Sequence, residues 1–154
     1  MSLDTLDRQI LALYQRDTRV PAEEIGAQVG LSAAAVQRRL KRLREDGVIV
    51  AETASLDLRK LGLGLTAIVS VDLVDESARA TQLFRDKVTA RGDVQQCYGV
   101  TGAADYVLIV VVADLAAYET FCAECLLHDA NVRSFSTQVV LESPKRGLAV
   151  NLPL

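Results

Sequence analysis

The sequence predicts an α+β protein in which an N-terminal helix-turn-helix precedes a ferredoxin-like domain with the order β-α-β-β-α-β. Three observations support this prediction. Apolar residues recur at helical spacing before residue 50, and a short basic helix closes that region. After residue 64, stretches with the period of strands alternate with stretches that have the period of helices.

Two helices are expected first. One spans Asp4 to about Arg16, where apolar residues repeat every three or four positions, and Asp4 with Asp7 resembles a capping box. The next begins near Pro21, because proline suits the first position of a helix. Gly30 then provides the tight turn that a helix-turn-helix requires.

The third helix is expected between Ser32, a favourable N-cap, and Gly47, which allows a left-handed turn at a helix end. Its apolar residues follow the i, i+4, i+7 spacing of one buried face: Val36, Leu40 and Leu43. Five cations occupy the seven positions 38–44: Arg38, Arg39, Lys41, Arg42 and Arg44. A helix that packs with one face and presents cations on the other is typical of the reading helix of this motif.

Exposed residues early on such a helix reach base edges in the major groove, where Gln37 suits adenine and Arg38 suits guanine. Short alanines allow close approach, and the hydroxyl of Ser32 and the cations further along are expected on phosphates. The predicted DNA-binding residues are Ser32, Ala33, Ala34, Gln37, Arg38, Lys41 and Arg42. The alternative is a basic helix face that is only solvated.

Two cations of this helix are not in that set. Arg39 and Arg44 flank the buried face, and they are expected to reach phosphate or to pair with nearby acids such as Asp46. The distribution of charge along the chain agrees with a nucleic-acid partner for the first region. The whole chain has a net charge of −3, but residues 1–50 hold eight Lys and Arg against seven Asp and Glu.

The remaining composition bounds the class of protein. Three cysteines are an odd number and do not suggest a disulfide framework. The acidic start MSLDTLD lacks an apolar stretch, so no signal peptide is expected. The longest strictly apolar run, Tyr106 to Ala113, is too short to span a bilayer. A soluble cytoplasmic protein is therefore expected, with no membrane partner.

The second half is predicted to hold four strands and two helices. The strands are expected at 65–74, 94–101, 105–113 and 132–142, and the helices at 76–91 and 115–128. The predicted organisation is a helix-turn-helix domain at 1–50, a linker at 51–64, the β-α-β-β-α-β domain at 65–142 and a C-terminal tail at 143–154. The tail has two prolines and no clear period, so no structure is predicted for it.

The strand at Tyr106–Ala113 is apolar at every position, so both of its faces should be dry. Helices cover only one face of a β-α-β-β-α-β sheet. A second identical sheet is the simplest cover for the other face, which predicts a homodimer through this domain. The alternative is that residues 1–64 cover that face.

Residues 3–142 resemble the Lrp/AsnC (leucine-responsive, feast/famine) transcriptional regulators. The matching residues are Leu3-Asp4, Asp7, Ile10-Leu11, Arg19, Leu31-Ser32, Val36, Arg39, Leu40, Arg42, Leu43, Gly47-Val48-Ile49, Val100 to Tyr106, Asp114 and Tyr118. The resemblance implies a winged helix-turn-helix followed by a RAM-type ligand-binding domain. It also implies a dimer that assembles into tetramers or octamers, a palindromic DNA operator, and amino-acid effectors held where dimers meet.

The chain departs from the family pattern twice. Leu58 follows Asp57 where proline is frequent, and Ala104 stands where a bulkier residue is common. The second departure leaves the identity of the effector open.

The turn from Gly102 to Asp105 is the candidate effector site. Exposed turn amides can bind a carboxylate while Asp105 meets an ammonium group, and an α-amino acid carries both groups. The resemblance implies a pocket lined by Tyr98, Val100, Thr101, Gly102, Asp105, Leu115, Thr137 and Gln138. The alternative is a hairpin turn in which glycine and aspartate serve the backbone alone.

The sequence leaves three other functions to compare with this one. Cys122, Cys125 and His128 lie on adjoining turns, but a fourth metal ligand is not apparent, so buried cysteines in a packed helix are expected and neither a metal nor a cofactor. Siroheme decarboxylases resemble the same family, yet the single histidine and the lack of a catalytic signature do not favour an enzyme. A DNA-compacting protein without an effector is the third possibility.

Overall fold

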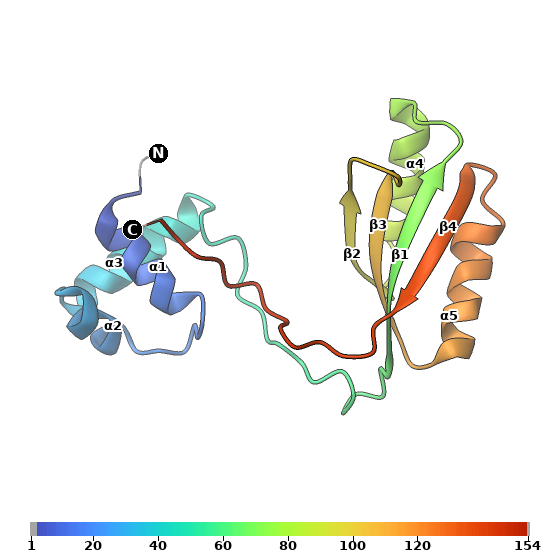
Figure 1. Cartoon of the computed structure of the whole chain (residues 1–154). Helices are drawn as coiled ribbons and strands as arrows, with labels where there is room; N and C mark the ends of the chain where they lie inside the picture. Colours follow the sequence, from blue (N-terminus) through green and yellow to red (C-terminus); the bar gives the residue numbers. More distant parts are fainter. Residues whose placement is uncertain (1–2, 154) are drawn as a thin grey trace. The chain divides into compact units, whose positions relative to one another are not determined.

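The structure is a computed structural model that describes residues 3–153, and it divides into two compact units (Figure 1). The N-terminal unit consists of the chain up to Ser55 together with the segment from Lys145 onward. The sheet unit consists of Leu56–Pro144. Two chain segments therefore connect the units, one before and one after the sheet unit in the sequence.

The N-terminal unit contains the three predicted helices. They are α1 (Thr5–Tyr14), α2 (Ala22–Val29) and α3 (Ala33–Glu45). The capping box is confirmed, because Asp4 accepts from the backbone N–H of Asp7 and Asp7 accepts from that of Asp4. The Ser32 hydroxyl caps α3 by accepting from the N–H of Ala35 at 3.2 Å. Pro21 precedes α2 as its N-cap residue and is not the first helical residue that the sequence predicted.

The turn between α2 and α3 is tight. Gly30 ends α2 with φ +73°, in the left-handed region that favours glycine. Gly26 lies in α2 directly against this turn, where an added Cβ would stand 2.3 Å from the carbonyl oxygen of Leu31. The three helices share a core of buried residues: Ile10, Tyr14, Ile25, Val36 and Leu40. This packing fixes α3 against α1 and α2.

The sheet unit has the predicted β-α-β-β-α-β order. Its elements are β1 (Leu65–Leu73), α4 (Ala78–Thr89), β2 (Val94–Gly99), β3 (Tyr106–Val112), α5 (Leu115–Cys122) and β4 (Val132–Val139), with a π-helical turn at Ala123–Leu127. The antiparallel sheet has the strand order β2-β3-β1-β4. Both α4 and α5 pack on one face of the sheet (Figure 1).

Within the sheet unit, Leu56–Pro144, no helix packs on the other face of the sheet. Val69 and Leu108 are paired neighbours on the helix-covered face and are fully buried. Ile68 and Ile109 are paired neighbours on the opposite face and are only half-buried. On one face of β3, the apolar side chains are buried by α4 and α5. The apolar side chains on the open face are not covered by any helix of the sheet unit.

Between α3 and β1, residues 46–64 contain turns and extended chain but no strand. The wing that the resemblance implied is here a single extended segment without a paired partner strand. Glu52 holds this segment to the helices, since its carboxylate accepts from the Tyr14 hydroxyl at 2.7 Å and from Arg44 Nε at 2.8 Å. Within residues 3–153, no helix has the length and apolar character needed to cross a bilayer.

The C-terminal tail, for which no structure was predicted, belongs to the N-terminal unit. Its chain runs to α1 in Figure 1. The side-chain amide of Gln15 bonds both the N–H and the C=O of Val150, and Arg8 donates to the carbonyl oxygen of Pro153. The tail is therefore attached to α1 through its backbone.

Candidate DNA interface and effector site

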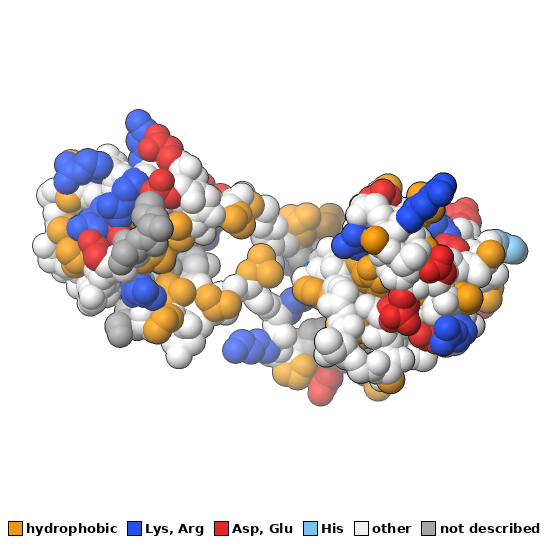
Figure 2. Space-filling model, turned by 90° about the horizontal axis from the view of Figure 1, so that it is seen from above, with side chains coloured by type: hydrophobic (Ala, Val, Ile, Leu, Met, Phe, Trp, Pro, Cys, Tyr) orange, Lys and Arg blue, Asp and Glu red, His pale blue; other side chains and the backbone are white. Residues whose placement is uncertain are grey.

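The solvent face of α3 presents residues that were predicted to contact bases or phosphates. Gln37, Arg38 and Lys41 are all exposed. Within residues 3–153, Arg38 forms no ion pair and no side-chain hydrogen bond. Lys41 pairs with Glu45 at 3.7 Å, a solvated contact that contributes little. These side chains are free to meet a nucleic acid. Figure 2 shows lysine and arginine side chains at several points on the visible surface of the N-terminal unit.

The start of α3 is open to close approach. Ala34 is exposed and Ala33 is half-buried, so only methyl groups cover the backbone there. The Ser32 oxygen accepts the capping bond from Ala35, which leaves its O–H free to donate to a phosphate oxygen. The first turn of α3 therefore offers small contacts, and the cations follow one turn later.

Two arginines of α3 converge on a buried carboxylate of α1. Asp7 is 1% exposed, and it accepts from Arg39 Nη1 at 2.8 Å and from Arg42 Nη2 at 2.6 Å. Arg39 also donates to Asp4 at 2.7 Å, and this bond holds the pKa of the Asp4 carboxyl below its usual range. The acids that pair with Arg39 are thus Asp4 and Asp7, whereas the sequence suggested Asp46.

The contact with Asp7 bears on the predicted role of Arg42. One Nη of its guanidinium is engaged, but the side chain remains 45% exposed. A guanidinium has five N–H donors, so bonding Asp7 leaves donors for a phosphate. Arg42 therefore belongs both to the attachment of α3 and to the predicted phosphate set.

A second cluster fixes the C-terminal half of α3. Arg44 donates to the Tyr14 hydroxyl at 2.7 Å as well as to Glu52. The guanidinium also lies 5.6 Å from the centre of the Tyr14 ring, within the range of a cation–π contact. Arg44 is therefore committed to holding α3 against α1 and the extended segment.

Sequence reasoning missed the role of Asp7. A signal was present, because Asp7, Ile10 and Tyr14 share the i, i+3, i+7 stripe that α1 buries. A carboxylate on a buried stripe needs a cationic partner, and α3 supplies two. The capping box alone explains an aspartate at this position, so the sequence pattern does not require a second role for Asp7.

The predicted effector turn connects β2 to β3. Val100 N–H donates to the carbonyl of Asp105 at 2.9 Å, and Gly102 has φ +116°. The Asp105 carboxylate is half-buried, and its Oδ2 accepts from the Leu73 N–H at 2.7 Å. Asp105 thereby fixes the hairpin to the end of β1, and its other carboxylate oxygen has no bonded partner among residues 3–153. Thr101 is exposed beside it.

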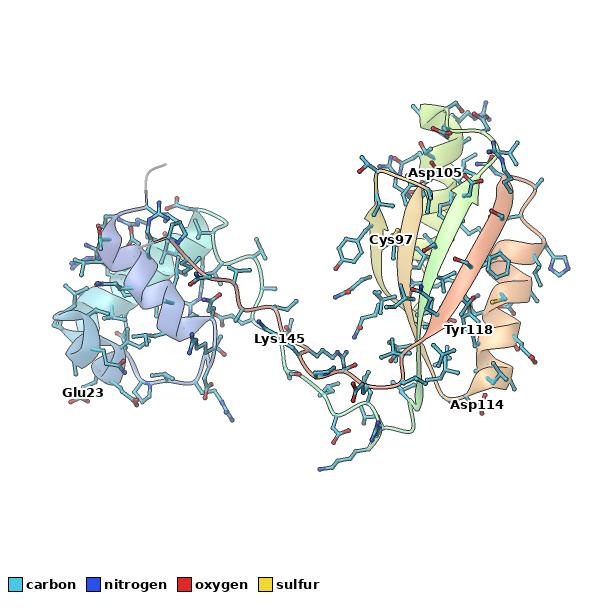
Figure 3. All side chains as sticks on the ribbon, in the orientation of Figure 1. Glu23, Cys97, Asp105, Asp114, Tyr118 and Lys145 are labelled. Atoms are coloured by element: carbon cyan, nitrogen blue, oxygen red, sulfur yellow. The ribbon has the colours of Figure 1, made fainter. Side chains whose placement is uncertain are left out.

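Three of the other predicted effector residues, Leu115, Thr137 and Gln138, belong to elements outside this hairpin. Leu115 lies in the first turn of α5, next to Asp114, and Figure 3 places Asp114 and Asp105 at opposite ends of the sheet. Thr137 faces the helices and shares a short hydrogen bond with the Tyr118 hydroxyl, whose pKa burial raises. Gln138 and Tyr98 lie on the open face, because side chains alternate along a strand.

The cysteines of the C-x-x-C sequence are buried in α5 and the π-helical turn. Burial raises the pKa of the Cys125 thiol, which disfavours the thiolate that binds metals. His128 bonds the carbonyl of Ala123 through Nδ1. Among residues 3–153, no group of three or more His, Cys, Asp or Glu residues is placed to hold a metal ion.

Comparisons with known proteins cover both units. The AsnC-type helix-turn-helix domain model matches residues 3–44, and the Lrp/AsnC ligand-binding domain model matches residues 66–150. An HTH-type transcriptional regulator of Sinorhizobium fredii is 36% identical over 154 residues, which cover 100% of this chain and 91% of that protein.

Two solved structures are similar over 97% of both chains. An AsnC family transcriptional regulator from Agrobacterium tumefaciens has a TM-score of 0.89 and 32% identity. A transcriptional regulator from Neisseria meningitidis, solved as a complex with L-Met, has a TM-score of 0.90 and 29% identity.

Proposed function

The chain belongs to the Lrp/AsnC family of DNA-binding transcriptional regulators, and we propose that it reads its operator with the solvent face of α3. One observation carries this proposal. Of the five cations of α3, Arg38 alone has no acidic partner among residues 3–153. The other four form ion pairs: Lys41 pairs weakly with Glu45, and the remaining three are Arg39, Arg42 and Arg44. A free guanidinium early on a reading helix suits a guanine edge.

We assign the contacts by position along α3. Gln37 and Arg38 meet base edges, and Ala33 and Ala34 let the helix approach the groove. Ser32, Lys41 and Arg42 bind phosphate oxygens, with Arg42 oriented by its bond to Asp7. In this assignment the first turns of α3 provide specificity and the later turn provides affinity that does not depend on sequence.

The open face of the sheet supports a homodimer. Ile68 and Ile109 are half-buried there and lie at the centre of the strand order, on β1 and β3. A second copy would bury these apolar side chains by the same surface on both subunits. Two N-terminal units then accompany each dimer, which suits a palindromic operator with half-sites one helical turn apart or a multiple of it. Further association gives the tetramers or octamers implied by the family.

The effector is proposed to be an amino acid bound at the Gly102–Asp105 turn. The Asp105 oxygen that is not bonded to Leu73 is placed to accept from an ammonium group, and the exposed turn amides meet a carboxylate. The relative from Neisseria meningitidis in complex with L-Met supports this ligand class. Because Leu115 and Gln138 lie away from the turn, the complete pocket is assembled from more than one protomer.

The remaining assignments follow from this function. We place the protein in the cytoplasm, with residues 1–50 for DNA, 51–64 as the linker and 65–142 for effector binding and dimerisation. A regulator is favoured over a siroheme-decarboxylase-like enzyme because the similar proteins named above are regulators. It is favoured over an architectural protein because the candidate effector turn leaves a carboxylate oxygen available.

DNase footprinting on the DNA upstream of the chain's own coding region tests the proposal, with and without a mixture of the twenty amino acids. One spaced palindrome whose protection changes with the amino acids is the expected result. Uniform protection along the DNA would mean an architectural protein. Protection by wild type but not by Arg38→Ala would assign base reading to α3, and equal protection by both would exclude that assignment.

A further inference from the structure

The C-terminal tail makes a specific contact with α1 that the proposed function does not use. The Gln15 amide donates to the carbonyl of Val150 at 2.8 Å, and its oxygen accepts from the N–H of the same residue at 3.0 Å. This is the pairing that a neighbouring β-strand would make with the tail. Arg8 adds a bond to the carbonyl of Pro153 at 3.2 Å.

Both contacts come from one face of α1. Arg8 and Gln15 are seven positions apart, which places them two turns apart on the same side of the helix. All three bonds go to the backbone of the tail, so an extended segment is recognised by its peptide groups. The apolar side chains of Leu148 and Val150 remain 82% and 62% exposed. Because little apolar area is buried, the tail is held by contacts that can release.

The helix that binds the tail also orients the reading helix. Asp7, next to Arg8 in sequence, anchors Arg39 and Arg42 of α3 on another face of α1. The tail therefore contacts the same helix that contacts α3, and a change in tail binding can reach the proposed DNA contacts through α1 alone. Residues 140–144 join this tail segment directly to the end of β4, the strand that carries Thr137 and Gln138.

We propose that residues 145–153 are a releasable strap, which binds α1 through Arg8 and Gln15 and couples the effector-binding sheet to the DNA-binding helices. The linker at 51–64 joins the two units permanently, whereas the strap adds a second connection only while it is bound. This inference rests on the proposed function for its input, the effector, but binding of the strap to α1 does not depend on any effector.

Hydrogen–deuterium exchange of the full-length chain tests strap binding directly. Two variants release the strap: deletion of residues 145–154, and the double substitution Arg8→Ala with Gln15→Ala. Arg16→Ala is the matched control, since Arg16 is exposed beside Gln15 and makes no side-chain bond among residues 3–153. We expect exchange in α1 to be about tenfold faster in the deletion and the double variant but unchanged in the control. Equal exchange in all of these proteins would overturn the strap.

DNA binding of the same proteins tests the coupling, with an operator duplex and an equimolar mixture of the twenty amino acids. In wild type the mixture should change the Kd. In both strap variants the Kd without amino acids should stay within about threefold of wild type, because α3 is intact, and the change on adding them should disappear. A full response that persists after strap deletion overturns the coupling. No response in wild type itself refutes the effector assignment, and the exchange result then still decides whether the strap binds.

Discussion

Replacement of Asp7 by asparagine should loosen α3 from α1. The asparagine side chain has the same size but carries no charge. Its NH2 group would face the N–H groups of Arg39 or Arg42, and two donors cannot form a hydrogen bond with each other. Arg39 would keep Asp4 as a partner, whereas Arg42 would lose its single acidic partner among residues 3–153. The perturbation therefore removes the buried end of both ion pairs and leaves the backbone and the helix cap nearly unchanged.

The size of the effect follows from burial. Removing one member of a fully buried ion pair costs about 3–5 kcal/mol. Here the carboxylate is 1% exposed, but the side chains of Arg39 and Arg42 are 22% and 45% exposed, so water solvates the charges left behind. We therefore expect a loss of about 2 kcal/mol in the free energy of unfolding of the N-terminal unit.

Asp4→Asn is the matched control. It removes the same charge from an acid that also bonds Arg39, but Asp4 is 51% exposed and asparagine remains a good N-cap, so the loss should be clearly smaller than that of Asp7→Asn. Hydrogen exchange of the α3 amides in the full-length chain measures the stability of the N-terminal unit separately from that of the sheet unit, in both variants. If Asp7→Asn destabilises α3 no more than Asp4→Asn does, Asp7 is not the anchor described above.

Three further predictions concern packing, assembly and pH. Gly26→Ala should destabilise the N-terminal unit by about 1–3 kcal/mol, because the new Cβ would stand 2.3 Å from the Leu31 carbonyl oxygen. This loss exceeds the gain from the better helix propensity of alanine. A thermal unfolding midpoint equal to that of wild type would contradict this prediction. Ile109→Lys should convert a dimer into a monomer in size-exclusion chromatography with light scattering, and a wild-type chain that is already monomeric at micromolar concentration would remove the dimer. Arg91 bonds Asp93 and holds the pKa of that carboxyl below its usual range, so the contribution of the pair to stability is complete above about pH 4 and is lost as the pH falls through the lower folded pKa. We therefore expect the free energy of unfolding of an Asp93→Asn variant, measured from pH 7 to pH 2, to approach that of wild type only below about pH 4. A difference in free energy that stays constant over this range would contradict the assignment.

Local signals predicted α3 well. The Ser32 cap, the buried residues Val36, Leu40 and Leu43, and the turn at Gly47 depend on neighbours within a few positions. The order of strands and helices in the sheet unit was equally clear, because each element has its own period. The strand ends were predicted one to three residues too long, since pairing partners decide where a strand stops.

Partners distant in sequence were not predictable in the same way. The acids that hold Arg39 and Arg42 lie more than thirty positions earlier, so only the packed helices show that Asp7 serves both. The contact between Gln15 and Val150 spans 135 positions and involves the backbone of the tail, which no side-chain pattern reports. The separation of Leu115 and Thr137 from Asp105 likewise depends on how α5 and β4 are arranged around the sheet, which local sequence patterns do not specify.

The salt dependence of binding to the footprinted operator tests the central claim, that α3 reads DNA, most directly. For a dimer that makes about six phosphate contacts, the account predicts a slope of log K against log salt near −5 for wild type. Lys41→Ala should make the slope less steep, by about one contact per subunit, for every DNA sequence. Arg38→Ala should reduce the preference for the operator over unrelated DNA. A slope near zero for wild type, with neither substitution changing affinity or preference, would contradict the assignment of α3 to DNA.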